Sequence, residues 1–173
     1  MKQKEKILFI SARPQFLISK ILKILKQDFE IYLYSMNKNF NKKEFEKVTD
    51  KVIVSNFMGQ NLLKKKKITA PFFIIKFLRD FINLKKINPD IIIAEGEPNW
   101  SCALAKLYFR NKRFIYFPYD ITYFANEVRK KISKIEKISE KFCFETADII
   151  IHKGPENELK LLPYKIKGKK IQF

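Results

Sequence analysis

Glycine, histidine and cysteine are scarce in this chain, and each scarcity excludes a class of function. The 173 residues include four glycines, one histidine and two cysteines. The glycines form neither G-x-G-x-x-G nor G-x-x-x-x-G-K, so dinucleotide binding and P-loop phosphate binding lack their usual sequence support. No G-x-S-x-G nucleophile elbow occurs, and a single histidine excludes most histidine-rich metal sites. We therefore predict no metal site, and the chain carries no self-sufficient catalytic motif.

Long hydrophobic runs and a signal-like start are also missing. No stretch of about 18 uninterrupted apolar residues suggests a membrane span, and the charged segment Met1 to Lys6 does not open a signal peptide. Cys102 and Cys143 fall on the apolar side of helical patterns and have no metal-ligand spacing. We expect them to be reduced core residues of a cytosolic protein, and a buried disulfide is the alternative.

Positive charge is in excess, with 36 lysines and arginines against 18 aspartates and glutamates and a formal net charge of +18. Such an excess attracts an anionic partner: nucleic acid, lipid head groups or a phosphorylated substrate. The most basic stretch, Leu62–Lys86, also carries a wide apolar helical surface, and this combination suits an anionic membrane. The alternative is an ordinary crossover helix that packs on a sheet. The candidate membrane-surface residues are Lys64, Lys65, Lys66, Lys67, Lys76 and Arg79.

Apolar runs alternate with amphipathic helical patterns along the chain. Strands are expected at 6–12, 29–34, 52–55, 90–95, 114–117 and 148–151. The run 90–95 is apolar without alternation, which is typical of a strand buried on both faces. The order predicts an α/β fold, a Rossmann-like doubly wound parallel sheet of about six strands. We expect one domain over residues 1–163 and a basic tail at 164–173 that has no closing element.

The helical patterns predict which side chains face the core. A helix over about 100–110 is expected to turn Ala103, Leu104 and Leu107 inward. A longer helix over 127–145 has an apolar line with steps of four, three, three and four residues, which is typical of a buried helical face. That line consists of Val128, Ile132, Ile135, Ile138 and Phe142. Pro71 suits the first turn of the helix within the basic stretch.

Polar residues follow several of the predicted strands. Ligands of such sheets bind beyond the carboxyl ends of the strands, so the loop 95–97 after the central strand is the first place to look for chemistry. In a parallel sheet all these strand ends meet one rim, and a rim with both acids and bases suits a polyhydroxyl or phosphorylated ligand. The alternative is that each residue is simply solvated or, for the histidine, makes a structural hydrogen bond. The candidates are Arg13, Glu95, Glu97, Asp120, His152 and Lys153.

Three segments carry a resemblance to a known family. They are 88–95 (NPDIIIAE), 114–120 (FIYFPYD) and 136–154, in which a helix runs into ADIIIHKG at 147–154. Over nearly the whole chain the pattern resembles the amino-terminal domain of GT-B glycosyltransferases of the retaining, family-4 type. The resemblance implies one half of a GT-B architecture, a domain that binds the acceptor. A second, carboxyl-terminal domain would bind the nucleotide-sugar donor, so no cofactor is implied for this chain.

The resemblance also implies roles for the strand-end residues. Asp120 stands where the family often places a catalytic-site histidine or aspartate. Arg13 stands in the loop that approaches the donor phosphates in relatives, although the glycines usual in that loop are absent here. The residues that would line the acceptor side or face the cleft are Glu95, Glu97, His152 and Lys153. Many such enzymes dock on membranes through basic amphipathic helices of this domain, which suits Leu62–Lys86.

The resulting hypothesis is the acceptor-binding half of a glycosyltransferase that acts on a glycan or lipid-linked acceptor. Residues 164–173 would begin the interdomain linker, and the donor-binding domain would be supplied in cis or by a separate chain. We expect no activity without it, and a cytoplasmic location, peripheral on the inner membrane face. One alternative is a non-enzymatic basic Rossmann-like module that binds nucleic acid or another polyanion, although the aromatic residues do not interleave with the basic ones as a stacking platform requires. Another is a structural domain whose charge reflects base composition.

Overall fold

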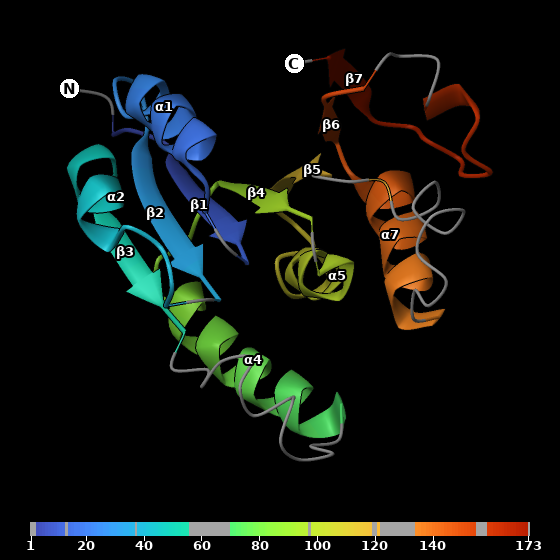
Figure 1. The fold of residues 1–173 in the computed structure, drawn as a ribbon, viewed down its shortest axis with the longest axis horizontal. Helices are drawn as coiled ribbons and strands as arrows, with labels where there is room; N and C mark the ends of the chain where they lie inside the picture. Colours follow the sequence, from blue (N-terminus) through green and yellow to red (C-terminus); the bar gives the residue numbers. More distant parts are fainter. Residues whose placement is uncertain are drawn as a thin grey trace. The chain divides into compact units, whose positions relative to one another are not determined.

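The computed structural model describes residues 3–12, 14–36, 38–55, 70–96, 98–118, 121, 134–154 and 159–172, with the backbone alone at 70–77. By its contacts the chain divides into two compact units, unit 1 (Met1–Asp90) and unit 2 (Ile91–Phe173). Figure 1 colours unit 1 from blue to green and unit 2 from yellow-green to red. Each unit consists of parallel strands joined by helices, and each is described separately.

Unit 1 contains three parallel strands in the order β3-β2-β1. Its elements are β1 (Lys6–Ser11), α1 (Phe16–Leu25), β2 (Glu30–Ser35), α2 (Lys42–Val48), β3 (Lys51–Val54) and α4 (Ala70–Lys85). Four consecutive apolar residues of β1, Ile7 to Ile10, are each at most 1% exposed, as expected for a strand covered on both faces. Pro71 lies in the first turn of α4, as predicted. Asn88, with a φ of 49°, follows the end of this helix, since asparagine tolerates the left-handed conformation.

Unit 2 contains four parallel strands in the order β4-β5-β6-β7. Its elements are β4 (Ile91–Glu95), α5 (Asn99–Tyr108), β5 (Arg113–Phe117), α7 (Lys134–Thr146), β6 (Ile149–His152) and β7 (Lys169–Gln172). Every residue of β4 is buried, which confirms the strand predicted from its unbroken apolar run. Helices α5 and α7 lie side by side (Figure 1). The strand orders 3-2-1 and 4-5-6 are those of the two halves of a Rossmann fold, so the predicted fold class is confirmed.

The tail of the chain does contain a closing element, so the expectation that it has none is wrong. Lys169–Gln172 forms β7, which pairs in parallel with β6 and brings Gln172 beside His152. Gly168 makes this approach possible, because a Cβ at that position would lie 2.3 Å from the carbonyl oxygen of Ala147. A short basic segment carries little hydrophobic signal, and for this reason its sequence did not predict a strand. All four residues of β7 are exposed.

Three aspartates, which we call the aspartate clamps, each bind a backbone residue of the neighbouring strand at its amino-terminal end. The pairs are Asp50 with Ile31, Asp90 with Lys6, and Asp148 with Phe114. In every pair the carboxylate accepts the strand residue's N–H, at 2.7, 2.9 and 2.7 Å respectively. The aspartate N–H donates to the carbonyl of the same residue, at 2.8, 2.9 and 2.9 Å. The clamps satisfy backbone groups that would otherwise be unpaired at the ends of the strands.

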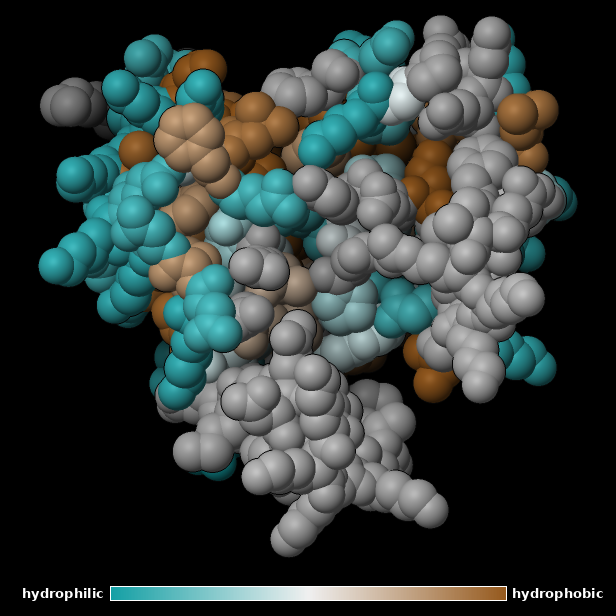
Figure 2. All heavy atoms as spheres, viewed as in Figure 1, coloured by the Kyte–Doolittle hydropathy of each residue, from teal (hydrophilic) through white to brown (hydrophobic). Residues whose placement is uncertain are grey.

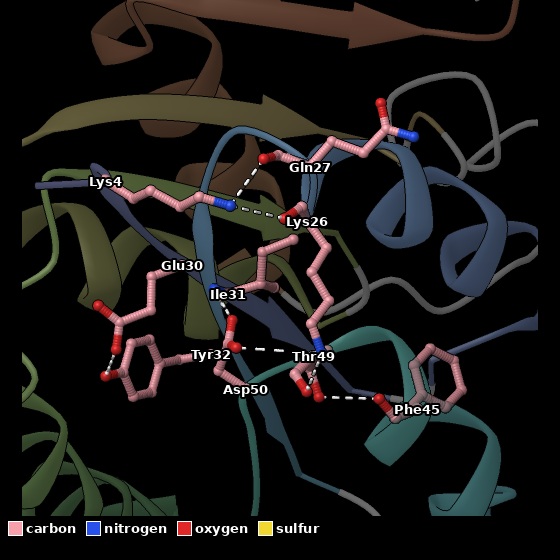
Figure 3. Close-up of polar contacts among 9 residues, drawn as sticks. All are labelled: Lys4, Lys26, Gln27, Glu30, Ile31, Tyr32, Phe45, Thr49 and Asp50. Atoms are coloured by element: carbon pink, nitrogen blue, oxygen red, sulfur yellow. Dashed lines mark hydrogen bonds and ion pairs between the residues drawn. The ribbon is translucent and has the colours of Figure 1, made fainter. Parts of the chain in front are cut away.

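Figure 3 shows the first clamp in its surroundings. Ile31 donates to Asp50, and the Lys26 ammonium group donates to the carbonyl of Thr49 at 2.9 Å and lies 3.9 Å from the Asp50 carboxylate. The Thr49 hydroxyl in turn donates to the carbonyl of Phe45, at 2.8 Å. The turn between α2 and β3 is therefore held by hydrogen bonds and an ion pair within unit 1.

The helix faces differ from the prediction in two places. In α5, Ala103 is buried but Leu107 is 57% exposed. In α7, Ile135 and Ile138 are 54% and 60% exposed, and the rest of that predicted line is half-buried Phe142 and two residues outside the described ranges. The buried residues of α7 are Ser139, Glu140, Cys143 and Phe144. The apolar line was wrong at these positions because the glutamates of α7 find hydrogen-bond partners inside unit 2, and this contact determines which face turns inward.

Two large apolar side chains of α1 face solvent. Phe16 is 64% and Ile24 is 67% exposed, while Ile18 and Leu22 of the same helix are buried. The Lys20 ammonium group lies 4.8 Å from the centre of the Phe16 ring, so part of this apolar surface is covered by a cation–π contact. In Figure 2 hydrophilic side chains gather over α1 and α2, with hydrophobic ones between them.

Candidate functional site

The carboxyl ends of β4, β5 and β6 form a common edge in unit 2, which we call the strand-end rim. It comprises Glu95–Gly96, Phe117–Pro118 and His152–Lys153. Glu95 is level with Phe117 in the register of β4 and β5. Tyr116 is level with Ile150 in the register of β5 and β6, so the ends of these strands also meet. The strand-end rim is where ligands bind in open α/β sheets, and it brings together Glu95, His152 and Lys153 of the predicted set.

The loop after β4 lies close to the end of β5. Gly96 donates its N–H to the carbonyl of Phe117 at 2.9 Å. A Cβ on Gly96 would lie 3.0 Å from Asn99 Oδ1 and 3.3 Å from the Tyr116 hydroxyl, so a side chain here would press on both. Glu95 itself is only 4% exposed, and its carbonyl accepts a hydrogen bond from the Cys102 thiol at 3.2 Å. Glu95 is therefore a buried carboxyl group at the rim and not a solvated loop residue.

Asn99 is the centre of a buried hydrogen-bond network beneath the rim. Its side-chain oxygen accepts a hydrogen bond of 2.6 Å from the Tyr116 hydroxyl, and its backbone N–H donates to Glu136 Oε2 at 2.7 Å. Glu136 belongs to α7, so its carboxylate occupies the amino terminus of α5, where the helix dipole favours a negative charge. One first-turn N–H of α5, a group that often binds phosphate in such folds, is thus already used.

A second buried carboxyl group, that of Glu140, lies on the same helix as Glu136. Glu140 is fully buried and accepts a hydrogen bond of 2.9 Å from the Tyr164 hydroxyl. The Phe144 ring packs against both tyrosines, with centroids 5.6 Å from Tyr164 and 5.2 Å from Tyr116. These contacts hold α7 and the segment after β6 against β5.

Burial keeps the nearby thiols and phenol in their neutral forms. Burial raises the pKa of Cys102, of Cys143 and of Tyr116 well above their ordinary values. A thiol that remains protonated is neither a nucleophile nor a metal ligand at neutral pH. Both cysteines are buried free thiols, as predicted, and the alternative of a disulfide is not realised. The network therefore orients the rim and supplies no covalent chemistry.

His152 ends β6 and is 2% exposed. Neither Nδ1 nor Nε2 has a hydrogen-bond partner, and no other fully buried side-chain nitrogen or oxygen of the described residues lacks one. The prediction left a structural hydrogen bond open for this residue, and the structure does not contain one. A buried donor or acceptor without a partner costs about 1–3 kcal/mol of folding free energy, so the position of His152 is energetically unfavourable.

Lys153 follows His152 and is exposed. Its ammonium group lies 5.8 Å from the centre of the Phe117 ring, within the range of a cation–π contact. Lysine and aromatic ring together form a positively charged, partly apolar part of the rim beside the buried Glu95. The rim thus offers a carboxyl group at the end of β4, and an imidazole and an ammonium group at the end of β6.

The carboxyl ends of β2 and β3 in unit 1 are organised differently. The Tyr34 hydroxyl donates to Asp80 Oδ2 at 2.8 Å, and the Ser55 hydroxyl donates to the same oxygen at 2.5 Å. Burial raises the pKa of Tyr34 far above its usual value. Asp80 lies on α4, so this triad attaches the crossover helix to the strands of unit 1. These polar groups satisfy one another, which indicates a structural role.

Several predicted site residues lie outside the described residues. They are Arg13, Glu97, Asp120, Lys64, Lys65, Lys66 and Lys67, as well as the side chain of Lys76. Arg79 lies on the exposed side of α4. Within the described ranges no group of three or more histidine, cysteine, aspartate or glutamate side chains is arranged to hold a metal ion.

Sequence reasoning missed Asn99, Glu136, Glu140 and Tyr164. Glu136 and Glu140 lie off the apolar line predicted for their helix, and only their spacing of one helical turn hints at a common face. Asn99 follows Pro98 at the predicted helix start, which is a position where asparagine often caps a helix. Its observed role is different, because it links α5 to β5 and α7.

A shallow basic hollow of about 320 Å³ lies away from this rim, at the amino-terminal end of β5. Its lining consists of Lys106, Arg110, Asn111, Lys112, Arg113 and Asp148. Lys106 lies 3.8 Å from the Asp148 carboxylate, so part of its charge is already paired. Since ligands of open α/β sheets bind at the carboxyl ends, we assign the candidate site to the strand-end rim and not to this hollow.

No family model matches the sequence, and no curated protein matches it significantly. Solved structures do match in fold. Sucrose-phosphate synthase from Thermosynechococcus elongatus superposes with a TM-score of 0.66 at 14% identity over 98% of this chain and 47% of its own. MurG from Acinetobacter baumannii superposes with a TM-score of 0.61 at 11% identity, over 97% of this chain and 45% of its own. A UDP-N-acetylglucosamine 2-epimerase superposes with a TM-score of 0.57 at 16% identity, over 87% of this chain and 42% of its own.

These matches describe fold and extent. The chain spans about half the length of each of these three structures, 42–47%. At identities of 11–16% the likeness shows the fold alone. The chain therefore has the fold of one half of a two-domain GT-B enzyme, as the resemblance implied, and no helix in the described part is long and apolar enough to cross a membrane.

Proposed function

We propose that this chain, which has the fold of a GT-B half, is the acceptor-binding half of a glycosyltransferase. The observation that carries the proposal is the match of 98% of the chain to less than half of a sucrose-phosphate synthase. Enzymes of this architecture combine two Rossmann-like domains, so a chain of this extent needs a second one. That domain binds the nucleotide-sugar donor and is supplied in cis or by a partner chain.

The strand-end rim is the acceptor site in this proposal. Its described groups are a buried carboxyl, a buried imidazole and an exposed ammonium group, at Glu95, His152 and Lys153. Such a set hydrogen-bonds the hydroxyl groups of a glycan or lipid-linked acceptor and orients one of them for transfer. Asp120, two residues beyond Pro118, is the proposed catalytic residue, and Glu97 and Arg13 are proposed to line the same cleft. The chemistry of the donor belongs to the other domain.

We also propose contact with the anionic inner face of the membrane through α4 and the lysines that precede it. The described part of α4 has two sides. Phe81 and Leu84 are buried, while Leu78 and Ile82 are 36% and 59% exposed next to the exposed Arg79. Exposed apolar residues beside cations are the arrangement by which a helix lies on an anionic lipid surface. Lys64 to Lys67 and Lys76 would extend this surface.

The proposal is tested by finding and adding the second domain. Sequencing the transcript beyond codon 173 and its neighbouring reading frames is expected to show a second Rossmann-like domain. The chain alone is expected to transfer no radiolabelled sugar from a panel of UDP-, GDP- and ADP-sugars to extracted lipids and glycans. Together with the second domain it is expected to transfer from at least one donor.

A matched pair of substitutions locates the site. In the complete enzyme, Asp120→Ala is expected to lower kcat by at least about 100-fold, the range typical of a group that acts in the transition state. Asp28→Ala, an exposed aspartate, is the control and should leave kcat unchanged. Salt-sensitive binding of oligonucleotides by the chain, with no second domain and no transfer, would instead establish a nucleic-acid module.

A further inference from the structure

We propose that the ring of His152 binds a pair of sugar hydroxyl groups of the acceptor, with one ring nitrogen donating a hydrogen bond and the other accepting one. This inference rests on the proposed function and specifies the chemistry of its acceptor site. Three observations carry it: the position of His152 in the strand register, the absence of partners for its ring nitrogens, and the carboxylates of α7 on the same side of the sheet.

The first observation is where His152 lies. Tyr116 packs edge-on against Phe144 of α7, which places it on the face of the sheet that α7 covers. Ile150 is level with Tyr116, and His152 is two residues further along β6, so it is on the same face one step nearer the rim. The Tyr116 hydroxyl is satisfied by Asn99. The hydrogen bonds described on this face therefore include Tyr116 but not His152.

The second observation is the state of the ring. His152 is 2% exposed, and neither nitrogen has a partner. An imidazole has two ring nitrogens that can form hydrogen bonds, and the fold leaves both unused, whereas the other fully buried side-chain nitrogens and oxygens of the described residues are paired. Unsatisfied buried groups in native proteins mark places where function is retained at the expense of stability.

The third observation concerns the class of ligand. A hydroxyl group both donates and accepts, so two neighbouring hydroxyls match a neutral imidazole at both nitrogens. A phosphate is negatively charged at neutral pH and is favoured by a free helix amino terminus. At α5 the first N–H already binds the Glu136 carboxylate at 2.7 Å. The carboxylates of Glu136 and Glu140 on α7 lie on this same side of the sheet, so the charged groups described here favour a neutral sugar over a phosphate.

The chain provides its own reporter for the test, because it contains one histidine and one tryptophan. The chain labelled with ¹⁵N-histidine gives two ring-nitrogen resonances, both from His152. Methyl glycosides of glucose, galactose, mannose and N-acetylglucosamine are added in turn, and inorganic phosphate is added separately. We expect at least one glycoside to shift both ring nitrogens in a saturable manner, and phosphate to shift neither. Absence of any glycoside effect, or an effect of phosphate alone, would overturn the proposal.

His152→Phe is the decisive variant, since it keeps a buried ring and removes both nitrogens. Binding of the glycoside, followed by the fluorescence of Trp100 in the first turn of α5, is expected to weaken about thirtyfold for two lost hydrogen bonds. The variant is expected to unfold at a temperature equal to the original or about 2–4 °C higher. Unchanged affinity, or a lower unfolding temperature that reveals a structural bond of the ring, would contradict the proposal. Lys160→Ala, at an exposed position, is the control and should bind normally.

The outcome is separable from that of the proposed function. If sugar transfer is found but the His152 resonances do not respond to glycosides, the function stands and this inference fails. If His152 binds a glycoside but no donor domain and no transfer are found, the sugar site stands and the transferase function fails.

Discussion

The two ends of the strands use their polar groups differently. At the amino-terminal ends the aspartate clamps bind backbone N–H and carbonyl groups of neighbouring strands at 2.7–2.9 Å. At the carboxyl ends unit 1 has the satisfied triad of Tyr34, Ser55 and Asp80, whereas unit 2 has His152 without partners. The difference teaches that a polar residue at a strand end is structural where its partners come from the chain. Where they are missing, as at His152, we propose that a ligand supplies them.

Alkaline pH is expected to have the largest effect, through the buried thiols and phenols. The pKa values of Cys102, Cys143, Tyr34 and Tyr116 are raised in the folded chain. A raised folded pKa means that the full stability is present below the unfolded values, about 8.5 for cysteine and 10 for tyrosine, and is lost as the pH rises above them. From pH 8 to pH 10 the free energy of unfolding should fall by about 4 kcal/mol, mainly through the two thiols.

Urea unfolding at pH 7, 8, 9 and 10 measures this loss. In the double variant Cys102→Ala, Cys143→Ala the free energy of unfolding should fall less steeply with pH, because only the tyrosines still contribute. If the free energy of unfolding changed equally with pH in the original chain and the double variant, the thiols would not be held neutral by the fold.

Asp80→Ala is expected to have the next largest effect, at the satisfied carboxyl end of unit 1. The substitution leaves the buried hydroxyls of Tyr34 and Ser55 without their acceptor, and the free energy of unfolding should fall by about 3 kcal/mol. Asp80→Asn keeps an acceptor oxygen and should lose less than half as much. Asp28→Ala, an exposed aspartate of the same unit, should change it by less than about 0.5 kcal/mol. If chemical unfolding showed that Asp80→Ala and Asp28→Ala lower the free energy of unfolding equally, the triad would have no structural role.

Asp148→Ala is expected to have the smallest of the three effects and tests the amino-terminal ends. The N–H of Phe114 loses its acceptor, and the surface ion pair with Lys106 contributes little, so the loss should be about 2 kcal/mol. Binding of a methyl glycoside by the folded variant, measured by Trp100 fluorescence, should be unchanged. A change in glycoside affinity as large as that of His152→Phe would mean that the two ends of the strands are not functionally distinct.

Much of the fold followed from local patterns. The apolar run 91–95 predicts a buried strand because its β-branched residues cannot remain in water, and the structure confirms it. The alternation of strands and helices likewise predicted the parallel α/β class. The sequence failed where the signal was not hydrophobic. β7 consists of exposed residues, two of them lysines, and forms because Gly168 lets the backbone approach β6.

The candidate site was predictable only in part. Strand-end reasoning selected Glu95, His152 and Lys153, and the structure has them at the carboxyl ends of β4 and β6. The same logic did not reveal the network of Asn99, Glu136 and Tyr116, whose members come from a helix start, a second helix and a strand interior. Contacts between residues 17 and 37 positions apart leave no periodic trace in a sequence.

The sequence by itself determined the class of the fold, the positions of its strands and the presence of polar groups at their ends, because these depend on hydrophobic periodicity and on local chain geometry. The tertiary structure alone decided which of those groups find partners. Asp90 and Asp148 precede apolar strands in the same way that Glu95 and His152 end them, yet the first pair is bound by backbone and His152 is not. The physical reason is that a hydrogen bond depends on distance and direction in space, and these are set when the strands assemble.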